Sequence, residues 1–182
     1  MRRPVFLLLL GLTCSIQGGR YYRTRITREL SLLVSTDLVP VPPDELATKF
    51  ISYRAPLAAY TNLNTDVEFG INTSVSRWRE SDIELMKSFY KTNIINLYDE
   101  VEFLSEDIHL INRRNFIVFE YLSTLLPEEE SVIHQAPIHK YTYVQYTIVR
   151  GTVYVFDFTS PPDQSSFWRP AVEKMMESVR IK

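Results

Sequence analysis

The sequence predicts an α+β fold in which a largely antiparallel sheet of about six or seven strands is flanked by helices, as an α-β-α sandwich. Two observations predict this arrangement. Apolar runs of strand length follow one another through short turns, which favours antiparallel pairing. Segments with helical periodicity interrupt these runs, and each carries an apolar stripe that needs a sheet face to cover. The predicted order is strand, helix, two strands, helix, four strands and a closing helix.

Residues 1–17 predict a signal peptide. Arg2 and Arg3 supply a positive start, and small or polar residues follow the short apolar run Val5–Leu12. Roughly eight apolar residues are too few for a membrane-spanning helix, which needs about 20. Residues 18–182 then suffice for a single domain with its own hydrophobic core. We expect an exported protein that is periplasmic or extracellular.

Cys14 is the only cysteine of the chain, and it follows the apolar run directly. The stretch Gly11-Leu12-Thr13-Cys14 resembles a bacterial lipobox, although Thr13 stands where a Gly, Ala or Ser is usual. Cys14 is therefore a possible lipidation site, and lipidation would make the protein a membrane-anchored lipoprotein. Cleavage near Ser15–Gly19 would instead remove the cysteine. In both cases the mature domain has no cysteine available for a disulfide.

The charge balance is mildly acidic, with 20 Lys and Arg against 22 Asp and Glu. This balance argues against nonspecific nucleic-acid binding, and we expect no nucleic-acid partner. The segment Arg20–Arg28 is nevertheless basic and rich in tyrosine. We interpret it as a solvated arm at the start of the domain, with contact to an anionic polymer or lipid head groups as the alternative.

The first half of the domain predicts two helices and three strands. The strands are Leu30–Val34, Pro56–Thr61 and Val67–Val75, and a short helix is expected at Asp44–Ser52. A longer helix follows, because Ser81-Asp82-Ile83-Glu84 is typical of a capping box. Its apolar side chains recur at helical spacing down to Tyr98, and we expect this stripe to belong to the core.

The second half predicts four strands and the closing helix. Strands at Glu100–Ile111 and Asn115–Leu125 precede an acidic loop over Pro127–Pro137. Tyr141–Val149 and Thr152–Ser160 then alternate around Arg150-Gly151, the pattern of a two-residue hairpin turn. A helix at Phe167–Val179 ends the domain. Its inward stripe consists of Trp168, Val172, Met175 and Val179, and Ser165 or Ser166 is expected to cap its start.

The element order and two stretches resemble the PsbP-like superfamily, which includes DcrB-like bacterial envelope lipoproteins. The stretches are the hairpin segments Tyr143–Ile148 and Val153–Pro161 and the chain end Met176–Ile181. The resemblance implies an α-β-α sandwich that covers nearly all of the mature chain. It also implies a binding or assembly role without a shared catalytic motif, and it supplies no active-site residue or cofactor for this sequence.

Few residues suggest chemistry. The three histidines, His109, His134 and His139, lack the cysteine or acidic neighbours of a zinc site, so we expect no metal and no cofactor. Glu120 and Asp157 fall inside predicted strands, where burial would raise their pKa values and suit them to acid–base work. The alternative, which we prefer, is a position on a sheet edge or an uncovered face, or an ion pair with an arginine such as Arg113 or Arg114. We therefore predict no catalytic residue.

The sequence favours a non-enzymatic exported interaction or assembly protein of the bacterial cell envelope. Its expected partner is another envelope or secretion-related protein. An alternative is a carrier of a small hydrophobic ligand or peptide in a groove of the sheet, to which Tyr141, Tyr143, Tyr146 and Tyr154 would contribute. A hydrolase is a third alternative, since catalytic triads are recognised by geometry, yet the chain has no Gly-x-Ser-x-Gly elbow.

Overall fold

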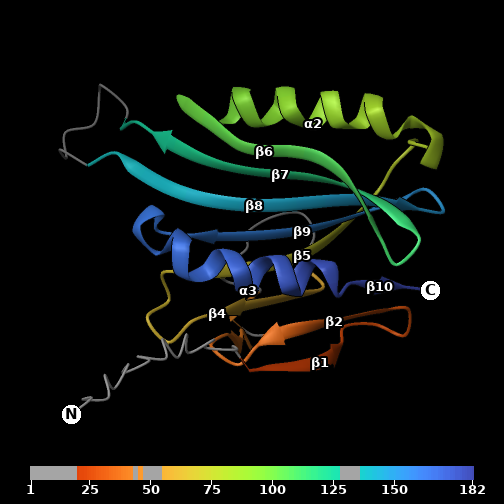
Figure 1. Cartoon of the computed structure of the whole chain (residues 1–182), viewed down its shortest axis with the longest axis horizontal. Helices are drawn as coiled ribbons and strands as arrows, with labels where there is room; N and C mark the ends of the chain where they lie inside the picture. Colours follow the sequence, from red (N-terminus) through yellow and green to blue (C-terminus); the bar gives the residue numbers. More distant parts are fainter. Residues whose placement is uncertain (1–19, 43–44, 47–54, 128–135) are drawn as a thin grey trace, which may run out of the picture.

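The computed structural model describes residues 20–42, 45–46, 55–127 and 136–182. Within them the chain forms two antiparallel sheets and two long helices, α2 and α3 (Figure 1). The elements are β1 Tyr21–Arg25, β2 Leu30–Ser35, β3 Val39–Pro40, β4 Ala58–Thr61, β5 Glu68–Val75, α2 Ile83–Leu97, β6 Glu100–Ile111, β7 Arg114–Leu125, β8 Ile138–Val149, β9 Thr152–Ser160, α3 Ser165–Glu177 and β10 Arg180–Ile181. The predicted α+β class with a largely antiparallel sheet is confirmed.

The main sheet has seven strands in the order β3-β4-β5-β9-β8-β7-β6, and the smaller sheet has the order β1-β2-β10. Two-residue turns with positive φ at both positions close the two long hairpins of the main sheet. These turns are Asn112-Arg113 and Arg150-Gly151. Positive φ at both central positions gives a turn whose twist matches that of the paired strands. The predicted terminal hairpin is therefore confirmed, turn included.

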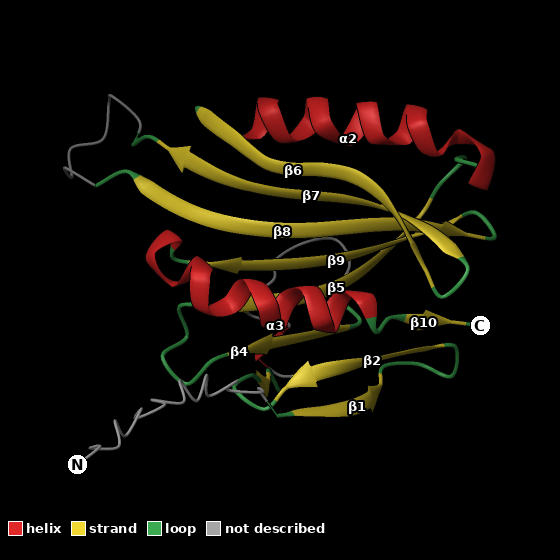
Figure 2. Ribbon diagram, in the orientation of Figure 1, coloured by secondary structure: helices red, strands yellow, loops and turns green. Residues whose placement is uncertain are grey.

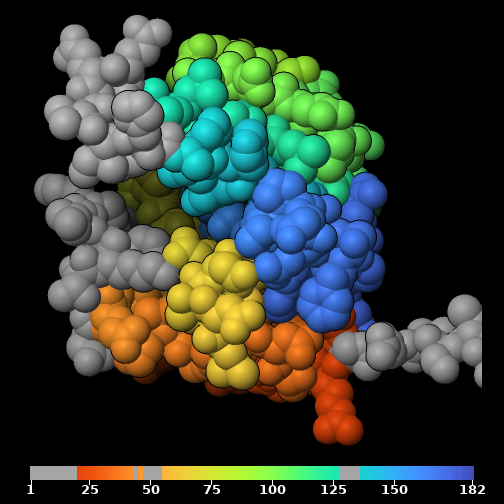
Figure 3. Space-filling view, turned by 90° about the vertical axis from the view of Figure 1, so that its left-hand side faces the viewer, coloured from red at the N-terminus to blue at the C-terminus, as the bar shows by residue number. Residues whose placement is uncertain are grey.

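Each face of the main sheet carries its own core. On one face α2 packs over β6, β7 and β8, mainly through Met86 and Ile94 against Ile117, Phe119 and Tyr146. On the other face α3 and β2 cover the sheet, and Phe69, Phe156 and Phe158 meet the inward stripe of α3. In the space-filling view of Figure 3, the blue closing segment and the orange β1–β2 segment pack together against the yellow β4–β5 segment.

The basic segment at the start of the domain is an ordered strand, so our expectation of a solvated arm was wrong. Its residues pair with β2 in register, from Tyr21 opposite Ser35 to Arg25 opposite Ser31. The arginines Arg20, Arg23, Arg25 and Arg28 are nevertheless all exposed. Because β1 is an edge strand and its side chains can reach solvent, its charge does not exclude strand pairing.

Both helix starts differ from the prediction. Short 3₁₀ turns, Glu80–Asp82 and Pro162–Gln164, precede α2 and α3. The expected capping box of Ser81 is absent, because the Asp82 carboxylate instead accepts from the Arg79 backbone N–H at 2.9 Å. Neither serine caps α3, whose N-cap is Gln164 without a side-chain cap bond.

The closing helix also ends earlier than expected. It stops at Glu177, and the next residues turn into β10, which pairs with β2. Ser178 makes this exit, since its hydroxyl donates to Met175 O at 2.6 Å and accepts from Leu33 N at 2.7 Å. The end of the chain therefore serves as a sheet strand as well as a helix.

Several predictions fall on residues outside the described ranges. These are the signal peptide at 1–17 with Cys14, most of the helix predicted for Asp44–Ser52, and the greater part of the acidic loop with His134. Within the described ranges, no helix is long and apolar enough to cross a membrane.

Candidate binding groove

A pocket of about 310 Å³ lies between the C-terminal half of α2 and the strands β5, β7, β8 and β9. We name it the tyrosine groove, because four tyrosines contribute to its wall. It is lined by Asn72, Tyr90, Asn93, Ile94, Leu97, Tyr98, Tyr121, Val144, Tyr146, Val155 and Asp157. A few polar groups converge there on an otherwise apolar and aromatic wall, which is the usual make-up of a small-molecule site.

The tyrosines of the groove form two contacting pairs. Tyr90 from α2 stacks on Tyr146 from β8 with ring centroids 4.0 Å apart. Tyr98, just after α2, packs against Tyr121 from β7 with ring centroids 6.0 Å apart. Burial raises the pKa of Tyr121 and of Tyr146 well above the usual tyrosine range. Both hydroxyls therefore stay protonated and uncharged in neutral solution.

Two periodicities bring these side chains together. On α2, Tyr90, Asn93, Ile94 and Leu97 are spaced by three or four residues, so they share one side of the helix. On the strands, alternate residues point to the same face. Val144 and Tyr146 of β8 and Val155 and Asp157 of β9 thus reach the groove, while their neighbours point toward α3.

Asp157 lies on the α2 face of β9, directly between Gly70 of β5 and Val144 of β8. Neither cross-strand neighbour has a polar side chain. Burial raises the pKa of the Asp157 carboxyl to about 6, and Lys140 opposes this shift while Glu68 adds to it. Asp157 thus fits the predicted case of a carboxylate with a raised pKa, and the arginine pair that we preferred for it is not observed among the described residues.

Glu120 lies on the opposite face of the sheet, under α3. It is buried, its Oε1 accepts from the Tyr141 hydroxyl at 2.9 Å, and its Oε2 accepts from Arg169 at 2.8 Å. The predicted arginine pair is therefore present, but the partner is Arg169 of α3 and not Arg113 or Arg114. Because the sheet separates Glu120 from Asp157, the two carboxyl groups do not form an acid–base pair.

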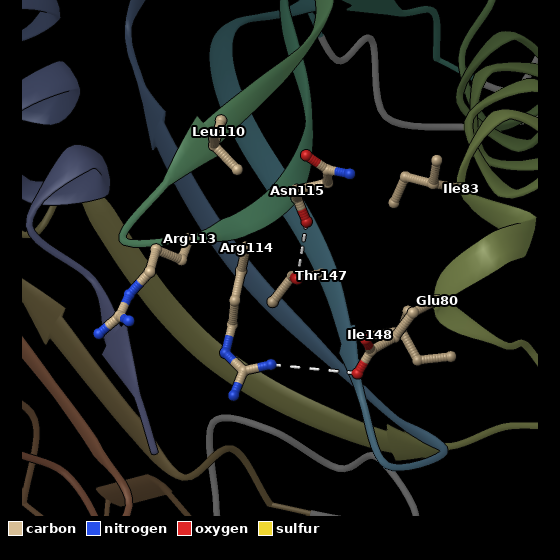
Figure 4. A pocket seen from close by; sticks show the side chains of 8 residues that line it. All are labelled: Glu80, Ile83, Leu110, Arg113, Arg114, Asn115, Thr147 and Ile148. Carbon is tan, nitrogen blue, oxygen red and sulfur yellow. Dashed lines mark hydrogen bonds and ion pairs between the residues drawn. The ribbon is translucent and has the colours of Figure 1, made fainter.

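Arg113 and Arg114 instead border a pocket of about 140 Å³ at the β6–β7 turn (Figure 4). Arg114 donates through Nε to the backbone oxygen of Ile181 at 3.3 Å, and its Nη1 lies 4.0 Å from Glu80. Arg114 therefore holds the chain end against β7.

The four tyrosines that we expected to line a groove do not lie together. Tyr146 is in the tyrosine groove, but Tyr141, Tyr143 and Tyr154 point to the other face and pack in the core beneath α3. This part of the prediction was wrong. Tyr141 and Tyr143 are an odd number of residues from Tyr146 along β8, and Tyr154 pairs with Thr147, so all three point to the opposite face of the sheet. Strand alternation predicted the face of the β8 tyrosines, and helical spacing predicted that the stripe with Tyr90 and Tyr98 faces inward. Nothing in the sequence predicted that these rings would meet Tyr146 and Tyr121.

The histidines lie apart in the described structure. His109 is on β6, and His139 on β8 lies with Nδ1 3.1 Å from the Thr124 hydroxyl. Among the described residues, no group of three or more potential ligands is placed to hold a metal ion.

The architecture matches solved structures at low sequence identity. The solution structure of cyanobacterial PsbP (CyanoP) from Synechocystis sp. PCC 6803 aligns with a TM-score of 0.56 and 12% identity, covering 95% of this chain and 99% of that one. The chain has a PsbP-like fold. LpqN of Mycobacterium tuberculosis, which its structure report describes as involved in cell envelope biogenesis, aligns with a TM-score of 0.53 and 12% identity over 91% of this chain and 87% of that one.

No protein-family model matches the chain, and no curated protein is detectably similar to it in sequence. The two alignments therefore establish the PsbP-like fold alone. They agree with the resemblance that the element order and the terminal hairpin had indicated.

Proposed function

We propose that this PsbP-like chain is a non-enzymatic exported protein of the bacterial cell envelope that acts by binding another envelope or secretion-related protein. The predicted signal peptide supports export. The envelope role attributed to LpqN, which shares the fold, supports the compartment. The observation that carries a binding role is the outer surface of α2.

Helix α2 is apolar on both of its sides. Met86 and Ile94 are buried against the sheet, yet Leu85 is 63% exposed and Phe89 is 47% exposed. Leu85, Phe89 and Leu97 follow one row of residues spaced by fours, which ends at the rim of the tyrosine groove. In the described part of the chain, no other element covers this outer side of α2 (Figure 2). Asn93 interrupts this row, but exposed apolar side chains gathered on one face are typical of a protein contact surface.

The test is capture of a partner from envelope extract with tagged protein and a Leu85→Lys/Phe89→Lys variant. Loss of one specific partner in the variant is the expected result, because two ammonium groups cannot enter an apolar contact without a large desolvation cost. Leu110→Lys is the matched control, since Leu110 is equally apolar and exposed but lies on β6. Equal capture by all three proteins would contradict the proposal, as would an enzymatic turnover in the purified chain.

A second candidate function, carriage of a small ligand, is favoured by the tyrosine groove itself. Its volume of about 310 Å³ falls at the lower end of the range of small-molecule sites. Native mass spectrometry of protein purified from its own host tests this candidate. A co-purifying small molecule that Tyr146→Trp displaces would support it, and an empty protein that no ligand library stabilises would contradict it.

A further inference from the structure

Asp157 is the only charged side chain among the described residues that line the tyrosine groove. Burial is the main cause of the raised pKa of its carboxyl group, and no hydrogen bond is among the causes of that shift. Gly70 and Val144, its neighbours on either side in the sheet, offer no side-chain donor. A partly buried carboxylate that lacks a donor is costly to keep ionised. A ligand that brings a positive charge would remove that cost.

The surroundings add no resident counter-charge within the groove. Lys140 and Glu68 act on Asp157 with opposite signs, and neither of them lines the groove. The hydroxyls of Tyr121 and Tyr146 are neutral, because burial raises the pKa of each. The groove is therefore net negative whenever Asp157 is ionised.

The remaining wall suits the rest of an organic cation. Aromatic rings attract cations through their electron-rich faces, and ammonium ligands are commonly held by several such rings. Tyr90, Tyr98, Tyr121 and Tyr146 provide these rings, and Ile94 and Leu97 provide aliphatic surface. The volume of about 310 Å³ admits a small molecule.

We infer that the tyrosine groove binds a small organic cation, an ammonium group on an apolar stem, with the ammonium at Asp157 and the stem along the tyrosine rings. This inference rests on the small-ligand function proposed above as the second candidate. It names the chemical class of the ligand and the residue that selects it.

Isothermal titration calorimetry with three probes of similar shape tests the inference. The probes are the cation 2-phenylethylammonium, the neutral 2-phenylethanol and the anion 3-phenylpropanoate. The cation is expected to bind about tenfold or more tightly than either of the others, since an ion pair outside bulk water is strongly favoured. Equal binding of 2-phenylethanol would overturn the charge selection while leaving a carrier function in place. Binding of none of the three would overturn both.

Two variants separate a binding carboxylate from a structural one. Asp157→Asn should weaken 2-phenylethylammonium about tenfold or more without lowering the melting temperature. Asp107→Asn removes an exposed carboxylate from β6, three strands away in the sheet, and should bind as the wild type does. Lowering the pH from 8 to 5 should also weaken the cation about tenfold, because the carboxyl pKa is about 6. Unchanged affinity in Asp157→Asn, or tighter binding at pH 5, would contradict the inference.

Discussion

Arg169 of α3 forms an ion pair with Glu120 of β7, with its Nη2 2.8 Å from the Glu120 Oε2. The glutamate is buried, while half of the arginine side chain remains exposed. Arg169 also lies 3.4 Å from Glu173, one helical turn further along α3. This contact fixes the closing helix on the sheet at one position, because a buried carboxylate needs its partner in place.

Replacing Arg169 by methionine is expected to destabilise the protein by roughly 1–3 kcal/mol. The reason is that Glu120 would remain buried with only the Tyr141 hydroxyl as partner. The figure is below that of a fully buried pair, since solvent reaches the exposed half of Arg169. Urea denaturation measures the change in the free energy of unfolding.

The double variant Glu120→Gln/Arg169→Met should recover much of that loss, since it leaves no unpaired charge and keeps an acceptor for Tyr141. A double variant that is less stable than Arg169→Met alone would contradict this account of the pair.

Trp168 should be the largest single contributor of α3 to stability. Its side chain is only 3% exposed and packs on Phe158 with ring centroids 5.5 Å apart. Trp168→Ala is expected to cost about 3–5 kcal/mol, because it removes buried surface and leaves a cavity. The neighbouring Phe167 is 64% exposed, so Phe167→Ala should cost well under about 1 kcal/mol. Thermal unfolding of both variants measures these losses of stability. Equal losses in the two variants would contradict the prediction and indicate that α3 is peripheral to the core.

Asp157 should make stability depend on pH in a defined window. Its pKa is about 6 in the folded chain against 3.8 for the free group, so the folded state holds its proton more tightly. Stability from this group is therefore present at low pH and is lost as the pH rises from about 4 to about 6. Asp157→Asn should exceed wild-type stability by on the order of 2 kcal/mol at pH 7, and the gain should vanish near pH 4. A pH-independent difference between the two proteins would count against it.

Two buried threonines of β8 offer a matched pair. Among the described residues the Thr142 hydroxyl has no hydrogen-bond partner, whereas the Thr147 hydroxyl donates to Asn115 O at 2.8 Å. Thr142→Val is expected to be neutral or stabilising by up to about 1 kcal/mol, and Thr147→Val to cost about 1 kcal/mol. Chemical denaturation of both variants decides the point, and a costly Thr142→Val would reveal an unrecognised partner of that hydroxyl.

The anchorage of the protein depends on Cys14, and intact-mass measurement of the mature protein from its host decides it. We expect cleavage beyond Cys14 and a soluble product, since Thr13 is a poor residue before a lipidated cysteine. The alternative is a diacylated N-terminal Cys14 and fractionation with membranes. The exposed arginines of β1 would then lie near the lipid, where each cation adds about 1 kcal/mol of attraction.

The sequence by itself determined the class of fold and most of the long elements. Alternation in Thr152–Ser160 and the four- and three-residue steps from Trp168 to Met175 are local periodicities, and each matches the geometry of one element. The turn at Arg150-Gly151 is equally local. The short strands β3 and β10 were not predicted, because each pairs with a partner that is distant in sequence. The strand formed by the basic start of the domain was not predicted either, since its partner β2 is close in sequence but its charged residues suggested a solvated arm.

Only the tertiary structure decided which side chains meet. Glu120 faces Arg169 and Asp157 faces the tyrosine groove because successive residues along each strand point to opposite faces of the sheet, and two different helices cover those faces. Tyr90 and Tyr146 are 56 positions apart in the chain and stack only when α2 is docked on the sheet. Periodicity specifies which way a side chain points within its own element, but the strand order and the helix docking specify what it points at.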